Sequence, residues 1–172
     1  MELEQAIRSR RTHKAYAPEP VERAVLDELF ELARWAPNHH LTNPWRFRVL
    51  GPRALERLKA AADAAQPGSA AKLDRAPTLV AATARMTGDA EQDREDLLAG
   101  AVAAYIVLLG AHGRGLAGYW RTVPAMDQPA GRAALGIGDG EAVLGLLHLG
   151  RPRQEQHVPE RAPVAAVVDY LD

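Results

Sequence analysis

The chain contains no cysteine among its 172 residues. This absence excludes disulfides, thiolate nucleophiles, iron–sulfur clusters and cysteine-based zinc sites. Any redox chemistry would therefore have to be carried by a bound cofactor. Serine is scarce as well, because Ser9 and Ser69 are the only two and neither lies in a nucleophile elbow. A Ser-His-Asp hydrolase is not expected.

An excess of positive charge is also absent, since 21 Lys and Arg residues are balanced by 22 Asp and Glu residues. The chain thus lacks the overall positive field that holds nucleic acid, which is not an expected partner. The longest uncharged apolar run, Leu97–Ala111, has 15 residues, short of the roughly 20 that a membrane span needs. The N-terminal stretch "MELEQAIRSRR" lacks the apolar core of a signal peptide. We expect one cytoplasmic domain over residues 1–172, without a membrane partner.

Periodic apolar residues predict a single domain of helices and strands. Two helices precede the first strand, and helices of unequal length separate the strands. This order favours an α+β or irregular α/β fold over a regular doubly wound sheet. The expected helices begin near Leu3 and then cover Val21–Ala36, Arg53–Ala65, Glu91–His112 and Gln128–Leu135, and the expected strands are Trp45–Leu50, Thr78–Met86, Leu116–Trp120, Ala142–Leu149 and Val164–Tyr170.

Three of these elements have informative patterns. The helix at Glu91–His112 begins charged and becomes apolar nearly all round, which is typical of a helix buried on most sides or packed against a partner. In the first strand, alternation predicts that Trp45, Phe47 and Val49 face the core. The last expected strand, Val164–Tyr170, follows a loose stretch with three prolines, so this tail could reach another subunit.

Two patterns that suggest cofactor or metal sites have simpler interpretations. The stretch "GRGLAG", Gly113–Gly118, matches G-x-G-x-x-G, but a dinucleotide site needs a strand before the motif and a helix after it. Here a helix precedes and a strand follows, so Gly113 and Gly115 are interpreted as a helix end. The six histidines have no carboxylate at ligand spacing, so a metal site is not expected.

Positive charge is concentrated near the N-terminus. The stretch "RSRRTHKAY", Arg8–Tyr16, holds five cationic side chains in nine residues. Cations at the end of the first helix would complement its dipole without any ligand. Arg10, Arg11 and Thr12 also offer two guanidinium groups and a hydroxyl, a set that suits a phosphate dianion. Such local charge in a nearly neutral chain favours the binding of a small anion.

Two further segments carry polar side chains that could face a ligand. The loop "WAPNHHLTNPWRF", Trp35–Phe47, links the second helix to the first strand and offers amide and imidazole groups. The stretch "YWRT", Tyr119–Thr122, ends the third strand with an aromatic residue, a cation and a hydroxyl. Each also has an ordinary interpretation, as a loop with turn-forming Asn and Pro residues and as the end of an edge strand.

In their order and spacing, these segments resemble the nitroreductase family of flavin mononucleotide (FMN) oxidoreductases. The resemblance extends from about Leu3 to Pro152 and is carried by "RRTHKAY", "APNHHLTNPWRF", "GLAGYWRT" and "GLLHLGRP". Each motif alone is loose, whereas the ordered set is fairly specific. The resemblance implies an α+β, nitroreductase-like fold with a central, mainly antiparallel sheet flanked by helices and a long buried helix at the subunit interface.

The resemblance also implies an enzyme. Members of the family are homodimers with FMN at the subunit interface, and they reduce nitroaromatic or quinone-like acceptors with NAD(P)H by ping-pong hydride transfer. Because the cofactor carries the reactive atom, no catalytic side chain is expected. The phosphate-binding cations near the C-terminus of larger members have only Arg151 and Arg153 as counterparts here.

The resemblance assigns a set of cofactor-binding residues. Those near the N-terminus would hold the FMN phosphate, with one lysine beside the flavin N1 and C2 carbonyl. Residues of the loop after the second helix would come from the neighbouring subunit. The expected contacts are Arg10, Arg11, Thr12 and Lys14, then Trp35, His39 and Asn43, and finally Trp120, Arg121 and Thr122.

Two other functions are compatible with the same residues. The chain could be a non-catalytic, dimeric module that binds a flavin or a nucleotide without turnover. It could also be a structural dimerisation domain whose basic cluster only ends a helix. Uptake of FMN would argue against the structural domain, and reduction of bound flavin by NADPH would argue against the module.

Overall fold

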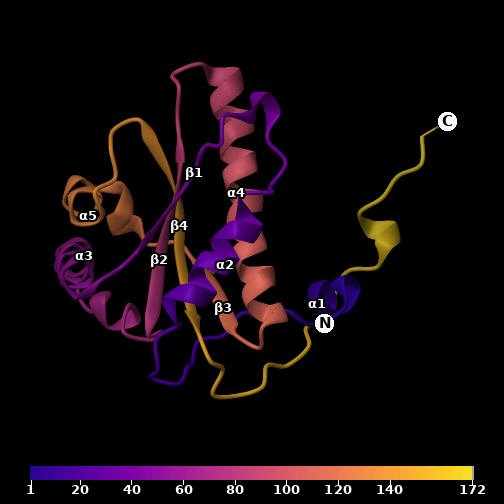
Figure 1. Cartoon of the computed structure of the whole chain (residues 1–172), viewed down its shortest axis with the longest axis horizontal. Coiled ribbons are helices and arrows are strands. Elements are labelled where there is room, and N and C mark those ends of the chain that lie inside the picture. Colours follow the sequence, from indigo (N-terminus) through magenta and orange to yellow (C-terminus); the bar gives the residue numbers. More distant parts are fainter. Residues whose placement is uncertain (172) are drawn as a thin grey trace.

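A computed structural model describes residues 1–171, and Asp172, the last residue of the expected domain, lies outside the described part. A four-stranded antiparallel sheet of order β1-β2-β4-β3 has helices on both faces, with α2 and α4 on one and α3 and α5 on the other (Figure 1). The expected α+β class and antiparallel sheet are confirmed. The helices are α1 (Leu3–Ser9), α2 (Arg23–Ala33), α3 (Pro52–Ala65), α4 (Ala90–Gly113) and α5 (Pro129–Leu135), and the strands are β1 (Trp45–Val49), β2 (Thr78–Arg85), β3 (Ala117–Arg121) and β4 (Glu141–Gly150).

Each face of the sheet has its own apolar core, because successive strand residues point to opposite faces. On the α2/α4 face, Leu29 and Val107 pack with Leu147 of β4. On the α3/α5 face, Leu58 packs with Leu146, the preceding residue of β4. All five side chains are completely buried. β4 therefore joins the two cores at the centre of the domain.

The long helix α4 buries one side and exposes the other. By length and composition it could cross a membrane, but its inner side packs against the sheet through residues such as Ala103 and Val107. Leu98 on the outer side is 60% exposed, and Leu97, Val102 and Tyr105 are exposed with it. Within one chain the helix is therefore buried on one side, and packing of its outer side against a partner stays a prediction. We call Leu97, Leu98, Val102 and Tyr105 the α4 stripe.

The "GRGLAG" motif ends α4, as the order of elements predicted. Gly115 has a φ of +73°, a left-handed conformation that glycine adopts without strain. Its N–H donates to the His112 carbonyl at 3.0 Å, and the Leu116 N–H donates to the Ala111 carbonyl at 2.9 Å. This pair of bonds satisfies the last carbonyls of the helix and starts β3 immediately afterwards.

Two expectations about strands were wrong. Val164–Tyr170 forms no strand; a short 3₁₀ turn (Val164–Ala166) interrupts an exposed C-terminal tail, residues 151–171, whose end lies away from the sheet (Figure 1). Among the described residues, no strand lies beside this apolar run for it to pair with. In β1, Val49 is 47% exposed, because it is the last residue of an edge strand.

Candidate functional site

The basic N-terminal segment is fixed along the outer edge of β3. Thr12 forms a parallel bridge with Gly118, and the His13 N–H donates to the Gly118 carbonyl at 3.2 Å. Just before it, α1 is tied to the last turn of α4, where Ser9 Oγ and His112 Nε2 lie 2.7 Å apart. The charged residues between these two anchors are therefore held beside the sheet.

A cavity of about 210 Å³ lies between this segment and the C-terminal tail. We call it the basic pocket, because three arginines and one histidine line it and none of its lining residues is a carboxylate. Arg10, Arg11 and Thr12, all expected at a phosphate, are brought together here. The tail supplies the remaining wall with Gln156, His157, Pro159 and Arg161.

Two buried donors at the basic pocket have no hydrogen-bond partner among residues 1–171. They are Nε of Arg11 and Nε2 of Gln156. The other end of the Arg11 side chain is fixed, since Nη1 donates to the Arg8 and Arg10 carbonyls at 2.7 and 2.9 Å. A buried donor without a partner costs roughly 1–3 kcal/mol, and an anion in the pocket would remove that cost. The donors therefore fit a phosphate group, as FMN would supply.

Two histidines next to the basic pocket are kept neutral. Burial, His112 and Arg10 together lower the pKa of His13, which is 9% exposed. Burial lowers the pKa of His112 in the same way, with Arg10 and Arg11 adding to the effect. The Arg10 guanidinium lies 6.0 Å from the centre of the Tyr105 ring. The arginines thus provide the fixed positive charge near neutral pH.

A second pocket of about 150 Å³ lies on the α3/α5 face near the end of β3. Arg121 and Lys72 line it, and neither forms an ion pair with another described residue. Burial lowers the pKa of Arg121, Tyr119 partly opposes this and Arg75 adds to it. In the described part of the chain, Nε of Arg121 is buried without a hydrogen-bond partner. This second pocket could therefore also accept negative charge.

The two pockets lie along the same strand. Thr12 of the basic pocket pairs with Gly118, and Arg121 of the second pocket is three residues further along β3. Three residues of a strand span about 10 Å. Lys14 and Thr122 are exposed and line neither pocket, so their expected roles stay predictions.

Trp120 faces away from the second pocket. Its indole packs against the α2/α4 core, and Nε1 donates to the Leu144 carbonyl at 2.8 Å. The bond forms at a bulge in β4, where Gly145 has a φ of +140° and a Cβ would lie 2.6 Å from the indole nitrogen. These contacts give Trp120 a packing role, and it lines neither pocket in this chain.

The loop expected to contact FMN lies at the other end of α4. His39 Nδ1 is 2.7 Å from Glu95 near the start of the helix, whereas Arg10 lies near Tyr105. Ten helical residues separate Glu95 from Tyr105, about 15 Å along the axis. Asn43, with a φ of +47°, belongs to this loop, and in Figure 1 the loop between α2 and β1 runs beside the start of α4. One chain therefore does not bring His39 and Asn43 to the basic pocket.

Trp35 also lies outside both pockets. Its side chain is 73% exposed, and Nε1 lies 3.4 Å from Glu31. Like His39 and Asn43, it is predicted to meet the cofactor of the neighbouring subunit. The expected roles of these three residues stay predictions.

The tail residues of the basic pocket were not predicted. From the sequence, Arg151 and Arg153 were the counterparts of the phosphate-binding cations near the C-terminus of larger family members. Both are exposed and line neither the basic pocket nor the second pocket. The structure brings in His157 and Arg161 instead. Arg161 is an isolated cation between two prolines of the tail. This position is the signal that could have identified it, because the tail could approach the N-terminal cluster there.

Residues 7–151 match the Nitroreductase family. YfhC of Bacillus subtilis (strain 168), a provisionally assigned NAD(P)H nitroreductase, is 24% identical over 175 residues, which cover 94% of this chain and 90% of YfhC. The crystal structure of a nitroreductase-like family protein from Bacillus cereus has a TM-score of 0.90 at 22% identity and covers 100% of this chain and 97% of its own. A provisionally assigned nitroreductase from Desulfovibrio desulfuricans, in complex with FMN, has a TM-score of 0.81 at 23% identity. The match covers 100% of this chain and 98% of that protein's chain.

Proposed function

The chain belongs to the nitroreductase family, and from this premise we propose that it is an FMN-dependent enzyme that uses NAD(P)H to reduce small nitroaromatic or quinone-like acceptors. The observation that carries the proposal is the basic pocket, with three arginines and two buried donors that have no hydrogen-bond partner in the part of the chain that the structure describes. The solved relative with bound FMN and the name of YfhC support the choice of cofactor and of electron donor.

In this proposal the basic pocket holds the FMN phosphate. Arg10, Arg11 and Arg161 provide charge, and the hydroxyl of Thr12 provides a further donor. Arginine is suited to this task because its planar group can bond two phosphate oxygens at once. The tail is thus part of the binding site.

The flavin ring is proposed to extend along β3 toward the second pocket. Arg121 and Lys72 would then face the polar edge of the ring. The bound cofactor supplies hydride transfer from NAD(P)H and then to the acceptor. The task of the chain is to orient the ring and to keep positive charge fixed where negative charge develops, and an unpaired guanidinium meets this need.

We further propose a homodimer with the cofactor at the interface. The α4 stripe exposes Leu98 and its neighbours, and α1 adds exposed Leu3 and Ile7 beside it. Exposed apolar residues gathered on adjacent helices are typical of a protein interface. Such an interface would let His39 and Asn43 of one subunit reach the cofactor of the other.

The proposal is tested by adding FMN to the apoprotein and then NADPH without oxygen. We expect stoichiometric FMN binding, loss of the flavin absorbance on addition of NADPH, and its return when a nitroaromatic compound or a quinone is added. Binding without reduction would favour a non-catalytic flavin module. A chain that takes up no FMN would contradict the proposal.

A further inference from the structure

His148 on β4 is a buried polar residue with no assigned role. Its side chain is completely buried on the α3/α5 face of the sheet. Neither Nδ1 nor Nε2 has a hydrogen-bond partner among the described residues. Leu146, two residues earlier on the same face, shows that an apolar side chain suits this layer. His148 is therefore kept at a cost to stability that packing does not explain.

The surroundings of His148 connect it to the second pocket. Tyr119 lies opposite it on β3, with ring centres 5.5 Å apart. Arg121 is two residues beyond Tyr119, so both side chains leave the same face of β3. Tyr119 raises the pKa of Arg121, and the charge of Arg121 lowers the pKa of His148. His148, Tyr119 and Arg121 thus form one cluster behind the second pocket.

His148 can accept a hydrogen bond from this cluster. Burial, followed by the charges of Arg121 and Arg75, lowers its pKa to about 4, so the ring is neutral near pH 7 and one nitrogen is a free acceptor. Arg121 has the matching donor, since its Nε–H is buried and no described residue bonds to it. A single water molecule is the usual bridge between buried polar groups that do not touch.

We propose that His148 is a positioning residue for Arg121: one ring nitrogen accepts the Nε–H of Arg121 through a bridging water and so holds the guanidinium in the wall of the second pocket. The remaining N–H groups of Arg121 are then left for the ligand. This inference rests on the proposed function, because the ligand at the second pocket is taken to be the flavin ring.

The test compares FMN binding to four apoproteins: the natural chain, His148→Phe, Arg121→Met and the double variant. We expect His148→Phe to raise the Kd for FMN about tenfold, as for loss of a hydrogen bond to a charged group. In the Arg121→Met background the same change should alter the Kd by less than about twofold, because the group that His148 positions has been removed.

Two measurements separate positioning from a structural role. Urea unfolding of apo His148→Phe should show no loss of stability at pH 7, since the variant removes two unpaired nitrogens; His148→Leu serves if the phenyl ring does not pack. His148→Gln, which keeps an acceptor, should bind FMN within about threefold of the natural chain.

An equal loss of FMN affinity in both backgrounds, or none in His148→Phe, would overturn the inference while leaving the proposed function intact. If the natural chain binds no FMN, both fail.

Discussion

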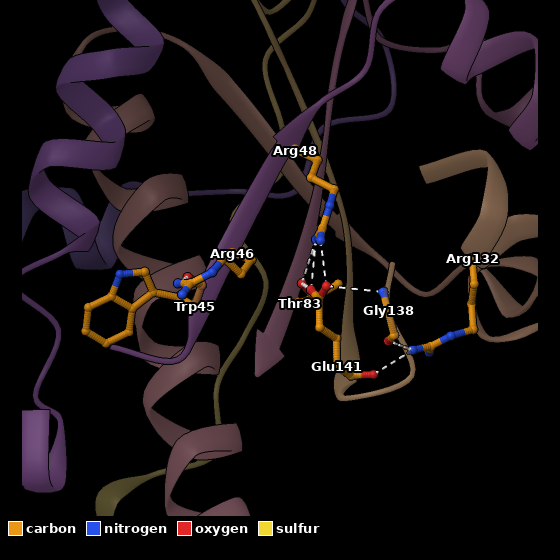
Figure 2. Close-up of polar contacts among 7 residues, drawn as sticks. All are labelled: Trp45, Arg46, Arg48, Thr83, Arg132, Gly138 and Glu141. Atoms are coloured by element: carbon orange, nitrogen blue, oxygen red, sulfur yellow. Dashed lines mark hydrogen bonds and ion pairs between the residues drawn. The ribbon is translucent and has the colours of Figure 1, made fainter. Parts of the chain in front are cut away.

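Arg48 of β1 and Glu141 of β4 form a two-pronged ion pair that spans β2. Arg48 Nη2 lies 2.6 Å from Glu141 Oε1, and Nη1 donates to Oε2 at 2.9 Å. Figure 2 shows Thr83 of β2 and the Gly138 N–H bonding the same carboxylate, while Arg132 binds the Glu141 carbonyl. The carboxylate thus joins three strands and the turn before β4. Burial alone would raise the pKa of Glu141, but the bonds from Arg48, Thr83 and Gly138 outweigh it and lower the pKa to about 2.

Replacement of Glu141 by Gln should destabilise the fold by about 2–3 kcal/mol at pH 7, because it breaks a largely buried pair. The folded-state pKa is depressed, so this stabilisation is complete above the ordinary value of 4.5 and is lost as the pH falls to about 2. Urea unfolding at pH 7 and pH 3 measures the difference, which should shrink at pH 3. Glu28→Gln, which removes the exposed pair with Arg114, is the control and should change stability by less than about 0.5 kcal/mol.

His148 should make the apoprotein less stable in mild acid. The unfolded chain takes up a proton near the ordinary pKa of 6.5, whereas folded His148 does so near 4, so stability falls as the pH drops through this range. Between pH 7 and pH 5 the natural chain should lose about 2 kcal/mol more than His148→Phe. Urea unfolding at the two pH values measures this, and parallel losses in the two proteins would contradict it.

Arg161→Ala should weaken FMN binding about tenfold and leave riboflavin binding unchanged, because riboflavin lacks the phosphate that the basic pocket is proposed to hold. Flavin fluorescence titrations of the apoprotein measure both ligands. Arg153→Ala, on the same tail but outside the pocket, is the matched control and should bind FMN normally. Equal weakening of both ligands by Arg161→Ala would show that its effect is not on phosphate.

Leu98→Glu combined with Val102→Glu should convert the proposed homodimer to a monomer, since it places two charges on the exposed α4 stripe. Sedimentation at micromolar concentration measures the mass, and FMN affinity should fall with dimer content. Val49→Glu, at an exposed position of β1, tests whether any added surface charge has this effect. A natural chain that sediments as a monomer would refute the dimer.

Local patterns predicted most of the fold. Alternation located β1, and the apolar run located α4, because helices and strands leave periods that can be counted along the chain. Sequence pattern failed at Val164–Tyr170, an apolar run that forms no strand. An apolar pattern shows that a segment could pair as a strand, but only the packed sheet determines whether a strand edge is available beside it.

The candidate site was only half predictable for a related reason. Arg10, Arg11 and Thr12 are adjacent in sequence, so their joint chemistry is visible locally. Arg161 meets them from 150 residues away, and no local pattern encodes such a return. His148 was passed over because a single histidine in an apolar strand has no partner in the sequence to mark it.

The basic pocket is lined by residues that precede the sheet in sequence and by residues that follow it, and this division sets the order of events during synthesis. Arg10 and Arg11 leave the ribosome before the four strands, whereas the wall that contains Arg161 leaves it only after them. A nascent chain can therefore complete its sheet while it still lacks a finished anion-binding wall. The wall of the proposed phosphate site is therefore completed only after the sheet that it borders.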